Sequence, residues 1–268
     1  MFFLDINLPG VSGLELAEQL LESKPDVTIV FVTAYDQYAL QAFEYNAIDY
    51  LVKPVNAQRL QKTVDRLKAK ISLPHPSVQK EVKAQVLSMN VCLSLSFQTE
   101  ERNTLSIAWR TSKAQELFLY LIHRRGQLVN KSYLIDLLWQ DLKPERAFSQ
   151  LYTSIYHIRK TLNQFSDHFK ITNLKDGYIL STSNVIIDIE EWERELLQLT
   201  PLSTKTIDAY IKTMNRYKGP YLHEYNYWWA EHDQYRLEQL WLDHAFKIAN
   251  YFHAHAQLLE AKHGTKRL

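Results

Sequence analysis

Three side chains with complementary chemistry stand near the ends of short apolar stretches in the first quarter of the chain: Asp5, Thr33 and Lys53. If these stretches are parallel strands, their carboxyl ends meet at one edge of a sheet, where such folds place reactive groups. A carboxylate at that edge could accept a phosphoryl group, a hydroxyl could bind one of its oxygens, and an ammonium could neutralise its charge. The spacing therefore predicts a site that accepts a phosphoryl group.

The elements that must position these groups follow from alternating strand-like and helix-like patterns over residues 2–70. Short apolar strands that alternate with helices indicate parallel βα units buried on both faces. We therefore expect an α/β domain over residues 1–71. Its expected strands are Phe2–Asp5, Val27–Thr33 and Asp49–Val52, and its expected helices begin near Leu14, cover about Gln37–Tyr45, and run from about Asn56 to Lys70.

The sequence around these groups resembles the receiver domain of bacterial response regulators. The similar stretches are Phe3–Gly13 (FLDINLPGVSG), Ile29–Ala34 (IVFVTA) and Asp49–Pro54 (DYLVKP). The resemblance implies a flavodoxin-like fold, a sensor histidine kinase as partner and Asp5 as the phosphoacceptor. It also implies that Thr33 and Lys53 contact the phosphoryl group, and that Tyr50 is the aromatic side chain that reorients on signalling. The Lys53–Pro54 peptide is expected to be cis, a form tolerated before proline.

In one respect the sequence departs from the receiver pattern. Receivers carry an acidic pair at the end of their first strand, far upstream of the phosphoacceptor, whereas Asp5 lies almost at the N-terminus. The resemblance thus implies an N-terminally truncated receiver, in which the strand of Asp5 is an open sheet edge. It also implies an incomplete Mg²⁺ site, because Asp5 and the backbone carbonyl of Asn7 supply few ligands without the acidic pair.

A second group of elements follows a proline-containing break. Leu73–Ser77 holds two prolines in three residues, which favours an extended backbone and indicates a linker over residues 72–88. An antiparallel strand pair, three helices and a hairpin then follow, an order that predicts a winged helix-turn-helix domain over residues 89–183. The expected strands are Val91–Phe97, Thr104–Trp109, Phe169–Asn173 and Tyr178–Thr182, and the expected helices are Ser112–His123, Lys131–Trp139 and Glu145–Asn163.

The third of these helices has the features of a helix that enters the major groove of DNA. Its apolar residues recur at helical spacing and are expected to face the core, and its polar residues are expected on the remaining surface, within reach of base edges and phosphates. The expected core residues are Ala147, Leu151, Ile155, Ile158 and Leu162, joined by Trp139, Tyr152 and Tyr178 from the surrounding elements. The expected DNA-binding residues of the helix are Arg146, Gln150, Thr153, Ser154, His157, Arg159 and Lys160, and those that flank it are Arg110, Lys113, Arg124, Arg125, Lys131 and Lys175.

The charge distribution supports a polyanionic partner for this segment. The net charge of the chain is +1. It is +4 over residues 89–183, however, and −2 over each of the segments 1–71 and 184–268. Positive charge concentrated in one segment favours binding of a polyanion there, and we expect duplex DNA as the partner.

The middle segment resembles the OmpR-like winged helix, in particular the variant found in activators of the antibiotic-regulatory-protein (SARP) type. The similar stretches are Arg110–Phe118, Leu134–Trp139, Leu151–Leu162 and Asp176–Leu180. The remainder resembles the first half of the bacterial transcriptional activation domain of the same family, over Val185–Glu193, Tyr217–Leu222 and Trp228–Glu231. This resemblance implies an all-α, TPR-like module over residues 184–268, with tryptophans in its core, that contacts RNA polymerase or another protein. The sequence leaves open whether the protein forms a homodimer.

Together the motifs predict a multidomain, cytoplasmic, DNA-binding transcription regulator of a two-component system, and no enzyme. The chain has one cysteine, Cys92, and no apolar run as long as a membrane span. One alternative is a phosphatase of the haloacid-dehalogenase type, which shares an aspartyl nucleophile with downstream Thr and Lys. Its general acid is a second aspartate two residues after the nucleophile, and Asn7 stands there. The other alternative is an interaction adaptor without DNA binding.

Overall fold

The computed structural model describes residues 1–8, 12–24, 27–35, 42, 47–71, 86–99, 104–105 and 107–264. The chain forms two compact units, one of Met1–Val82 with Ala108–Ser183 and one of Lys83–Ile107 with Asn184–Leu268. This grouping differs from the predicted boundaries, because residues 83–107 belong with the C-terminal segment. In the described part of the chain, no helix combines the length and the apolar character that crossing a membrane requires.

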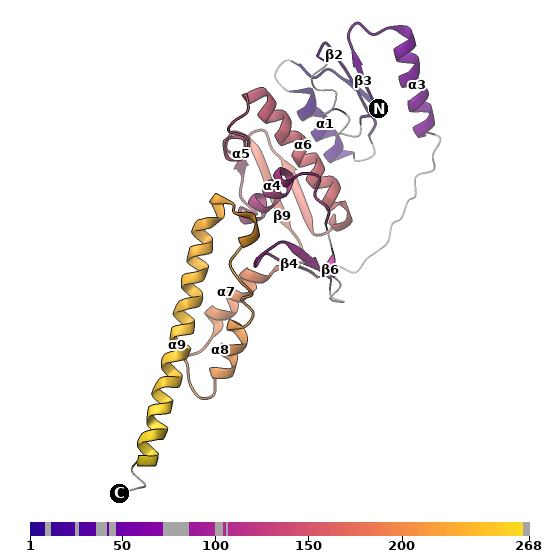
Figure 1. Ribbon diagram of the computed structural model, residues 1–268. Helices are drawn as coiled ribbons and strands as arrows, with labels where there is room; N and C mark the ends of the chain where they lie inside the picture. Colours follow the sequence, from indigo (N-terminus) through magenta and orange to yellow (C-terminus); the bar gives the residue numbers. More distant parts are fainter. Residues whose placement is uncertain are drawn as a thin grey trace. The chain divides into compact units, whose positions relative to one another are not determined.

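The first unit begins with a parallel sheet of three strands, as the alternating pattern predicted (Figure 1). The strands are β1 (Phe2–Leu4), β2 (Ile29–Thr33) and β3 (Asp49–Val52), in the order β1-β2-β3. Leu4 is opposite Phe31, and Thr33 is opposite Val52. The carboxyl ends of the strands therefore meet at one edge of the sheet, which is the arrangement the predicted site requires. β1 lies at the side of this described sheet, with Phe2 and Phe3 exposed.

Two helices accompany this sheet, α1 (Gly13–Ser23) and α3 (Ala57–Ile71). Leu67 of α3 packs with Val30 and Leu51 in the core beside the sheet. The Lys53–Pro54 peptide between β3 and α3 is cis. Of the helix expected over Gln37–Tyr45, only residue 42 lies within the described residues.

The start of α1 is held against the end of β1 at a point where only glycine fits. The amide of Gly13 donates a hydrogen bond to the carbonyl oxygen of Ile6 at 2.7 Å, and the Ser12 hydroxyl caps the helix by accepting from the amide of Leu14. A Cβ at Gly13 would lie 1.9 Å from the carbonyl oxygen of Asp5. The side chain of any other residue would therefore push α1 away from the strand that carries Asp5.

The winged helix also lies in the first unit, with an apolar core as predicted. Its elements are α4 (Ser112–His123), β7 (Val129–Asn130), α5 (Lys131–Leu138), α6 (Pro144–Leu162), the short 3₁₀ helix η1 (Asn163–Phe165), β8 (Phe169–Asn173) and β9 (Gly177–Thr182). α6 packs on α4 and α5, and β8 and β9 form a hairpin that β7 extends. Pro144 opens α6 at a position where its fixed φ suits the helix.

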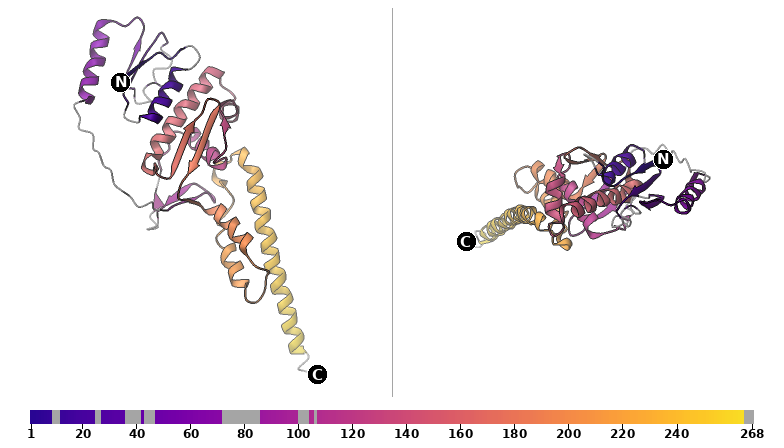
Figure 2. Two further views of the ribbon diagram at one scale, coloured as in Figure 1. Left: turned by 180° about the vertical axis from the view of Figure 1, so that it is seen from behind. Right: turned by 90° about the horizontal axis from the view of Figure 1, so that it is seen from above.

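Helix α1 packs against α6 (Figures 1 and 2). The helix that follows β1 is thus in contact with the helix predicted to enter the major groove, although Glu15 and Tyr152 are 137 positions apart in the sequence. The sequence patterns did not predict this contact.

The second unit combines a sheet with helices, and it corrects three expectations. Its strands β4 (Leu87–Asn90), β5 (Ser96–Gln98), β6 (Thr104–Leu105) and β10 (Val185–Ile187) form the sheet β10-β4-β5-β6. β4 begins inside the predicted linker 72–88. The strand expected over Val91–Phe97 is wrong, because Leu93 with φ of 66° lies in a turn between β4 and β5. Val185 starts a strand and not a helix, since the apolar run Val185–Ile187 pairs in parallel with β4.

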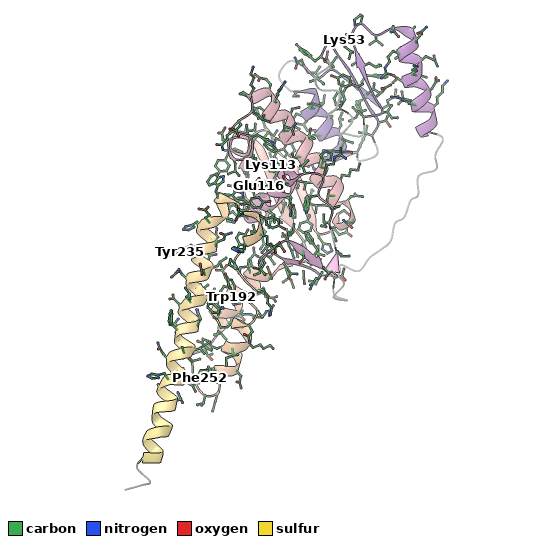
Figure 3. The ribbon with its side chains drawn as sticks, in the orientation of Figure 1. Lys53, Lys113, Glu116, Trp192, Tyr235 and Phe252 are labelled. Carbon is green, nitrogen blue, oxygen red and sulfur yellow. The ribbon has the colours of Figure 1, made fainter. Side chains whose placement is uncertain are left out.

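The helices of this unit are α7 (Asp188–Gln198), α8 (Ile207–Met214), the short 3₁₀ helices η2 (His223–Tyr225) and η3 (Trp228–Ala230), and α9 (Glu231–Gly264). α8 packs on both α7 and α9. Trp192, labelled in Figure 3, is fully buried and lies 4.8 Å from the Tyr217 ring between centroids. Trp229 is also buried, whereas Trp228 is 61% exposed, so the expectation of tryptophans in the core fails for Trp228.

We expect Gly13→Ala to destabilise the first unit by about 3 kcal/mol, because a Cβ at this position overlaps backbone atoms that cannot move independently. Gly126→Ala is the matched control: no atom lies within 4 Å of its Cβ position and only its φ of 75° opposes the change, at a cost of about 1 kcal/mol. Denaturant unfolding followed by circular dichroism measures both. Equal losses for the two variants would show that the approach of α1 to Asp5 does not limit stability.

Candidate functional site

The three groups predicted at the sheet edge do come together. The Nζ atom of Lys53 donates a hydrogen bond to Oδ2 of Asp5 at 2.7 Å, and the backbone amide of Asn7 donates to Oδ1 at 3.3 Å. Lys53, labelled in Figure 3, keeps about half of its side chain exposed, and Asp5 keeps 27%. The carboxylate is therefore accessible to a small phosphoryl donor.

The environment of Asp5 favours its ionised form. The hydrogen bond from Lys53 is the main cause that lowers the pKa of Asp5, and partial burial opposes it. The nearby Thr33 hydroxyl adds to the lowering of this pKa, although its fully buried Oγ1 makes no hydrogen bond of good geometry with the described residues. A hydroxyl without a partner beside the carboxylate is suited to bind an oxygen of an incoming group.

Tyr50 points inward from β3. Its ring is buried, and its hydroxyl donates a hydrogen bond to the backbone carbonyl of Tyr35. The hydroxyl thus joins β3 to the segment that follows β2.

The residues described here do not fit a divalent cation site. Lys53 already binds Oδ2 of Asp5, and Asn7 is the one further predicted ligand. Among the described residues, no three His, Cys, Asp or Glu side chains gather in a way that could hold a metal ion.

Sequence reasoning missed a buried carboxylate at the start of β3, at the opposite end of this strand from Lys53. Asp49 has a fully buried side chain that accepts two hydrogen bonds of 2.5 Å from Arg59 and one of 2.9 Å from Arg66. The Thr63 hydroxyl donates another at 2.6 Å. Burial raises the pKa of Asp49, but these hydrogen bonds outweigh it and lower the pKa to about 2. The network joins β3 to α3, and an aspartate within an apolar strand was the signal for it.

The predicted core of the winged helix is confirmed. Ala147, Leu151, Ile155, Ile158 and Leu162 are all buried, and so are Trp139, Tyr152 and Tyr178. Their burial follows from helical spacing, because residues that recur every three or four positions share one face of α6.

The predicted polar surface of α6 is wrong at several positions. Thr153, Ser154 and His157 are buried, since α6 is enclosed on more sides than its apolar face. Lys131 is also buried, and its ammonium lies against the rings of Tyr152 and Tyr178 and binds Glu15 of α1. Arg159 is 20% exposed and pairs with Glu18 and Glu22 of α1. Thr153, Ser154, His157 and Lys131 are thus largely covered, and the guanidinium of Arg159 is engaged by α1.

The remaining predicted DNA-binding residues are accessible to different degrees. Gln150 and Arg125 are half-buried, and Lys113 is exposed and pairs with Glu116 at 2.9 Å (Figure 3). The exposed cationic side chains are Arg110, Arg124, Arg146, Lys160 and Lys175.

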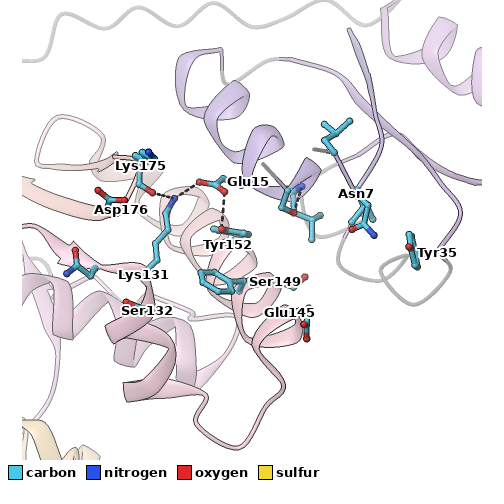
Figure 4. A pocket seen from close by; sticks show the side chains of 16 residues that line it. Asn7, Glu15, Tyr35, Lys131, Ser132, Glu145, Ser149, Tyr152, Lys175 and Asp176 are labelled. Atoms are coloured by element: carbon cyan, nitrogen blue, oxygen red, sulfur yellow. Dashed lines mark hydrogen bonds and ion pairs between the residues drawn. The ribbon is translucent and has the colours of Figure 1, made fainter. Parts of the chain in front are cut away.

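A hollow of about 1210 Å³ is bordered by residues 6–8 after β1, by Tyr35 and by α5 and α6. Figure 4 shows the side chains that line it. Glu15 stands at its border, with one carboxylate oxygen toward Lys131 and the other toward the Tyr152 hydroxyl. The end of β1 and helix α6 thus border the same hollow.

Comparison with known proteins supports the receiver resemblance of the N-terminal segment. Residues 1–65 match the family model of the response regulator receiver domain. A protein of Vibrio cholerae named "Uncharacterized response regulatory protein" is 41% identical over 148 residues, which are 50% of this chain and 61% of that protein. The sensory transduction protein LytT of Bacillus subtilis is 48% identical over 68 residues, 25% of this chain and 28% of LytT.

The chain therefore contains a receiver segment and is similar to response regulators, but it spans less than two thirds of these relatives. Among solved structures, Mycobacterium tuberculosis EmbR in complex with a low affinity phosphopeptide is 16% identical with a TM-score of 0.46, covering 67% of this chain and 51% of EmbR. The expected SARP type and the expected truncation stay predictions.

The 268-residue chain is expected to gain little or no phosphoryl adduct from acetyl phosphate, with or without Mg²⁺. Asp5 and the phosphoryl group are both anionic, and among the described residues Lys53 is the cation that pairs with Asp5 and offsets their repulsion. Intact-mass spectrometry measures the adduct. Asp5→Asn gives the background, and a chain extended at its N-terminus by a segment with two acidic residues is expected to regain the adduct. An efficient adduct on the 268-residue chain that Asp5→Asn abolishes would contradict the expectation.

Glu18 makes the free energy of unfolding of the protein depend on pH. Burial raises its pKa from 4.5 to about 7, against the opposing effects of Arg159, Tyr178 and Lys131, while Glu22 adds to the rise. Between about pH 4.5 and about pH 7, Glu18 is more protonated in the folded state than in the unfolded state. The free energy of unfolding therefore falls as the pH rises through this range. Glu18→Gln, which cannot ionise, is expected to remove this part of the dependence. Urea unfolding of both proteins at about pH 5 and about pH 8 tests this. An unchanged pH dependence in the variant would contradict it.

Proposed function

We propose that this protein is a DNA-binding transcription regulator of a two-component system, with the winged helix as its DNA-binding part. In this proposal Asp5 is the acceptor position of the receiver segment, and a sensor histidine kinase is its partner. α6 enters the major groove, and the turn before β9, with Lys175, contacts the neighbouring backbone.

One observation carries the DNA-binding proposal. A helix of 19 residues with a buried apolar face, α6, stands beside a hairpin, and cationic side chains of both elements remain exposed. These exposed cationic residues are Arg146 and Lys160 on α6 and Lys175 in the turn between the hairpin strands. Arginine and lysine on one helix and an adjacent turn are suited to phosphates and to base edges.

The second unit is proposed to contact RNA polymerase or another protein. This proposal is supported by large aromatic side chains that remain exposed on α9, namely Tyr235, Phe246 and Phe252. Tyr235 and Phe252 are labelled in Figure 3. Exposed aromatic residues are typical of surfaces that bind other proteins.

We expect the full chain to bind duplex DNA with an affinity that falls steeply with salt. With about four to six phosphate contacts, the logarithm of the affinity should fall against the logarithm of the salt concentration with a slope of about −4 to −5. Lys160→Ala should weaken binding about tenfold and make the slope shallower by about 1. Lys212→Ala, an exposed lysine of α8, is the matched control. Fluorescence anisotropy measures both, and binding that does not respond to salt would contradict the proposal.

A further inference from the structure

Three glutamates of α1 hold two cations of the winged helix. Glu15, Glu18 and Glu22 lie three and four positions apart, so their side chains share one face of the helix. Glu15 binds the Nζ atom of Lys131 at 2.5 Å. Glu18 and Glu22 bind the two terminal nitrogens of Arg159 at 2.9 and 3.0 Å.

The other groups that bind these carboxylates are neutral donors. The hydroxyl of Tyr178 donates to Glu18 at 2.7 Å, and that of Tyr152 donates to Glu15 at 3.1 Å. The backbone amide of Asn173 lies 3.3 Å from a carboxylate oxygen of Glu22. Arginine, lysine, tyrosine hydroxyls and backbone amides are the groups that proteins use to contact DNA phosphates. The acidic face of α1 therefore engages donors of the kind that would otherwise bind a nucleic-acid backbone.

These contacts involve both elements of the proposed DNA interface. Lys131 begins α5, Tyr152 and Arg159 belong to α6, and Asn173 and Tyr178 belong to the hairpin β8–β9. With α1 in place, 7% of the Lys131 side chain and 20% of the Arg159 side chain are exposed. The charged groups of both cations are engaged by α1 carboxylates, so a phosphate would have to compete with α1 for them.

We propose that α1 is an intramolecular lock whose glutamates Glu15, Glu18 and Glu22 take the place of DNA phosphates on the winged helix. This inference rests on the proposed DNA binding and adds its regulation: the locked chain binds duplex DNA through its outer cations alone, and displacement of α1 adds Lys131 and Arg159 to the interface.

The chemistry of the contact suits a reversible lock. Its anchors are ion pairs and hydrogen bonds, whose attraction is partly offset by the cost of removing charges from water. Duplex DNA offers these cations an alternative set of anions, so the α1 carboxylates and the phosphates compete for the same donors.

The test compares two triple variants of the full chain, each with three glutamates replaced by glutamine, at about pH 8, where Glu18 is largely ionised and both variants change the net charge about equally. Glu15→Gln, Glu18→Gln and Glu22→Gln together weaken the lock but preserve side-chain size. Glu191→Gln, Glu193→Gln and Glu195→Gln together remove three charges from α7, whose glutamates pair with Arg216 and Arg236. The probe is a fluorescein-labelled duplex of mixed sequence and about 30 base pairs, and circular dichroism checks that each variant is folded.

We expect the α1 variant to bind the duplex at least about tenfold more tightly than the α7 variant, with a steeper salt slope because two more cations contact phosphates. Glu22→Gln alone, at the exposed end of the acidic face, should give a smaller gain and should not affect folding. Equal affinities of the two triple variants, with salt-dependent binding in both, would overturn the lock and leave the proposed DNA binding intact. No binding by any protein, the α1 variant included, would overturn both proposals.

Discussion

The carboxylate of Glu18 is the contact on which the arrangement of the first unit depends. It is fully buried, and its two oxygens accept hydrogen bonds from Arg159 of α6 and from Tyr178 of β9. A buried carboxylate is costly unless it is paired and fully hydrogen-bonded, and losing one partner would leave an uncompensated charge. α1, α6 and β9 are therefore held in one arrangement by the need to satisfy a single anion.

Only a short stretch of chain separates Glu18 from Asp5, which follows β1. Gly13 sits against the carbonyl of Asp5, and α1 begins there, so Glu15 and Glu18 follow within the first two turns. A change in the backbone at the end of β1 would alter the position of α1, since the close approach at Gly13 leaves no slack between them. The chemistry at Asp5 and the exposure of Arg159 are thus physically connected in this unit.

The second unit is stabilised by a different kind of contact. Asp188, at the start of α7, accepts hydrogen bonds from the backbone amides of Val91 and Cys92 just after β4. These bonds satisfy the polar backbone where β4 ends, and they tie residues nearly one hundred positions apart. The pairing of β10 with β4 explains why residues 83–107 group with the C-terminal segment.

The elements that were predictable from sequence are those with strong local patterns. Ser112–His123 and Phe169–Asn173 agree with the prediction to the residue, because amphipathic spacing, the Thr111 cap and a β-rich run act over short distances. The approach of Asp5, Thr33 and Lys53 was also predictable, since parallel strands place their carboxyl ends at one edge.

What the sequence alone determined was therefore the position of the helices and strands with strong local patterns, and which residues meet at the edge of the parallel sheet. The tertiary structure decided which cations face solvent. Lys131 and Arg159 look like surface residues of a basic segment, yet they are covered by glutamates 116 and 141 positions away. An ion pair between such distant residues depends on how whole helices pack, and no local periodicity encodes that choice. The burial of Glu18 could not be predicted for the same reason. Helical spacing places this residue on the polar face of α1, and only the packing of α6 and β9 against α1 buries it.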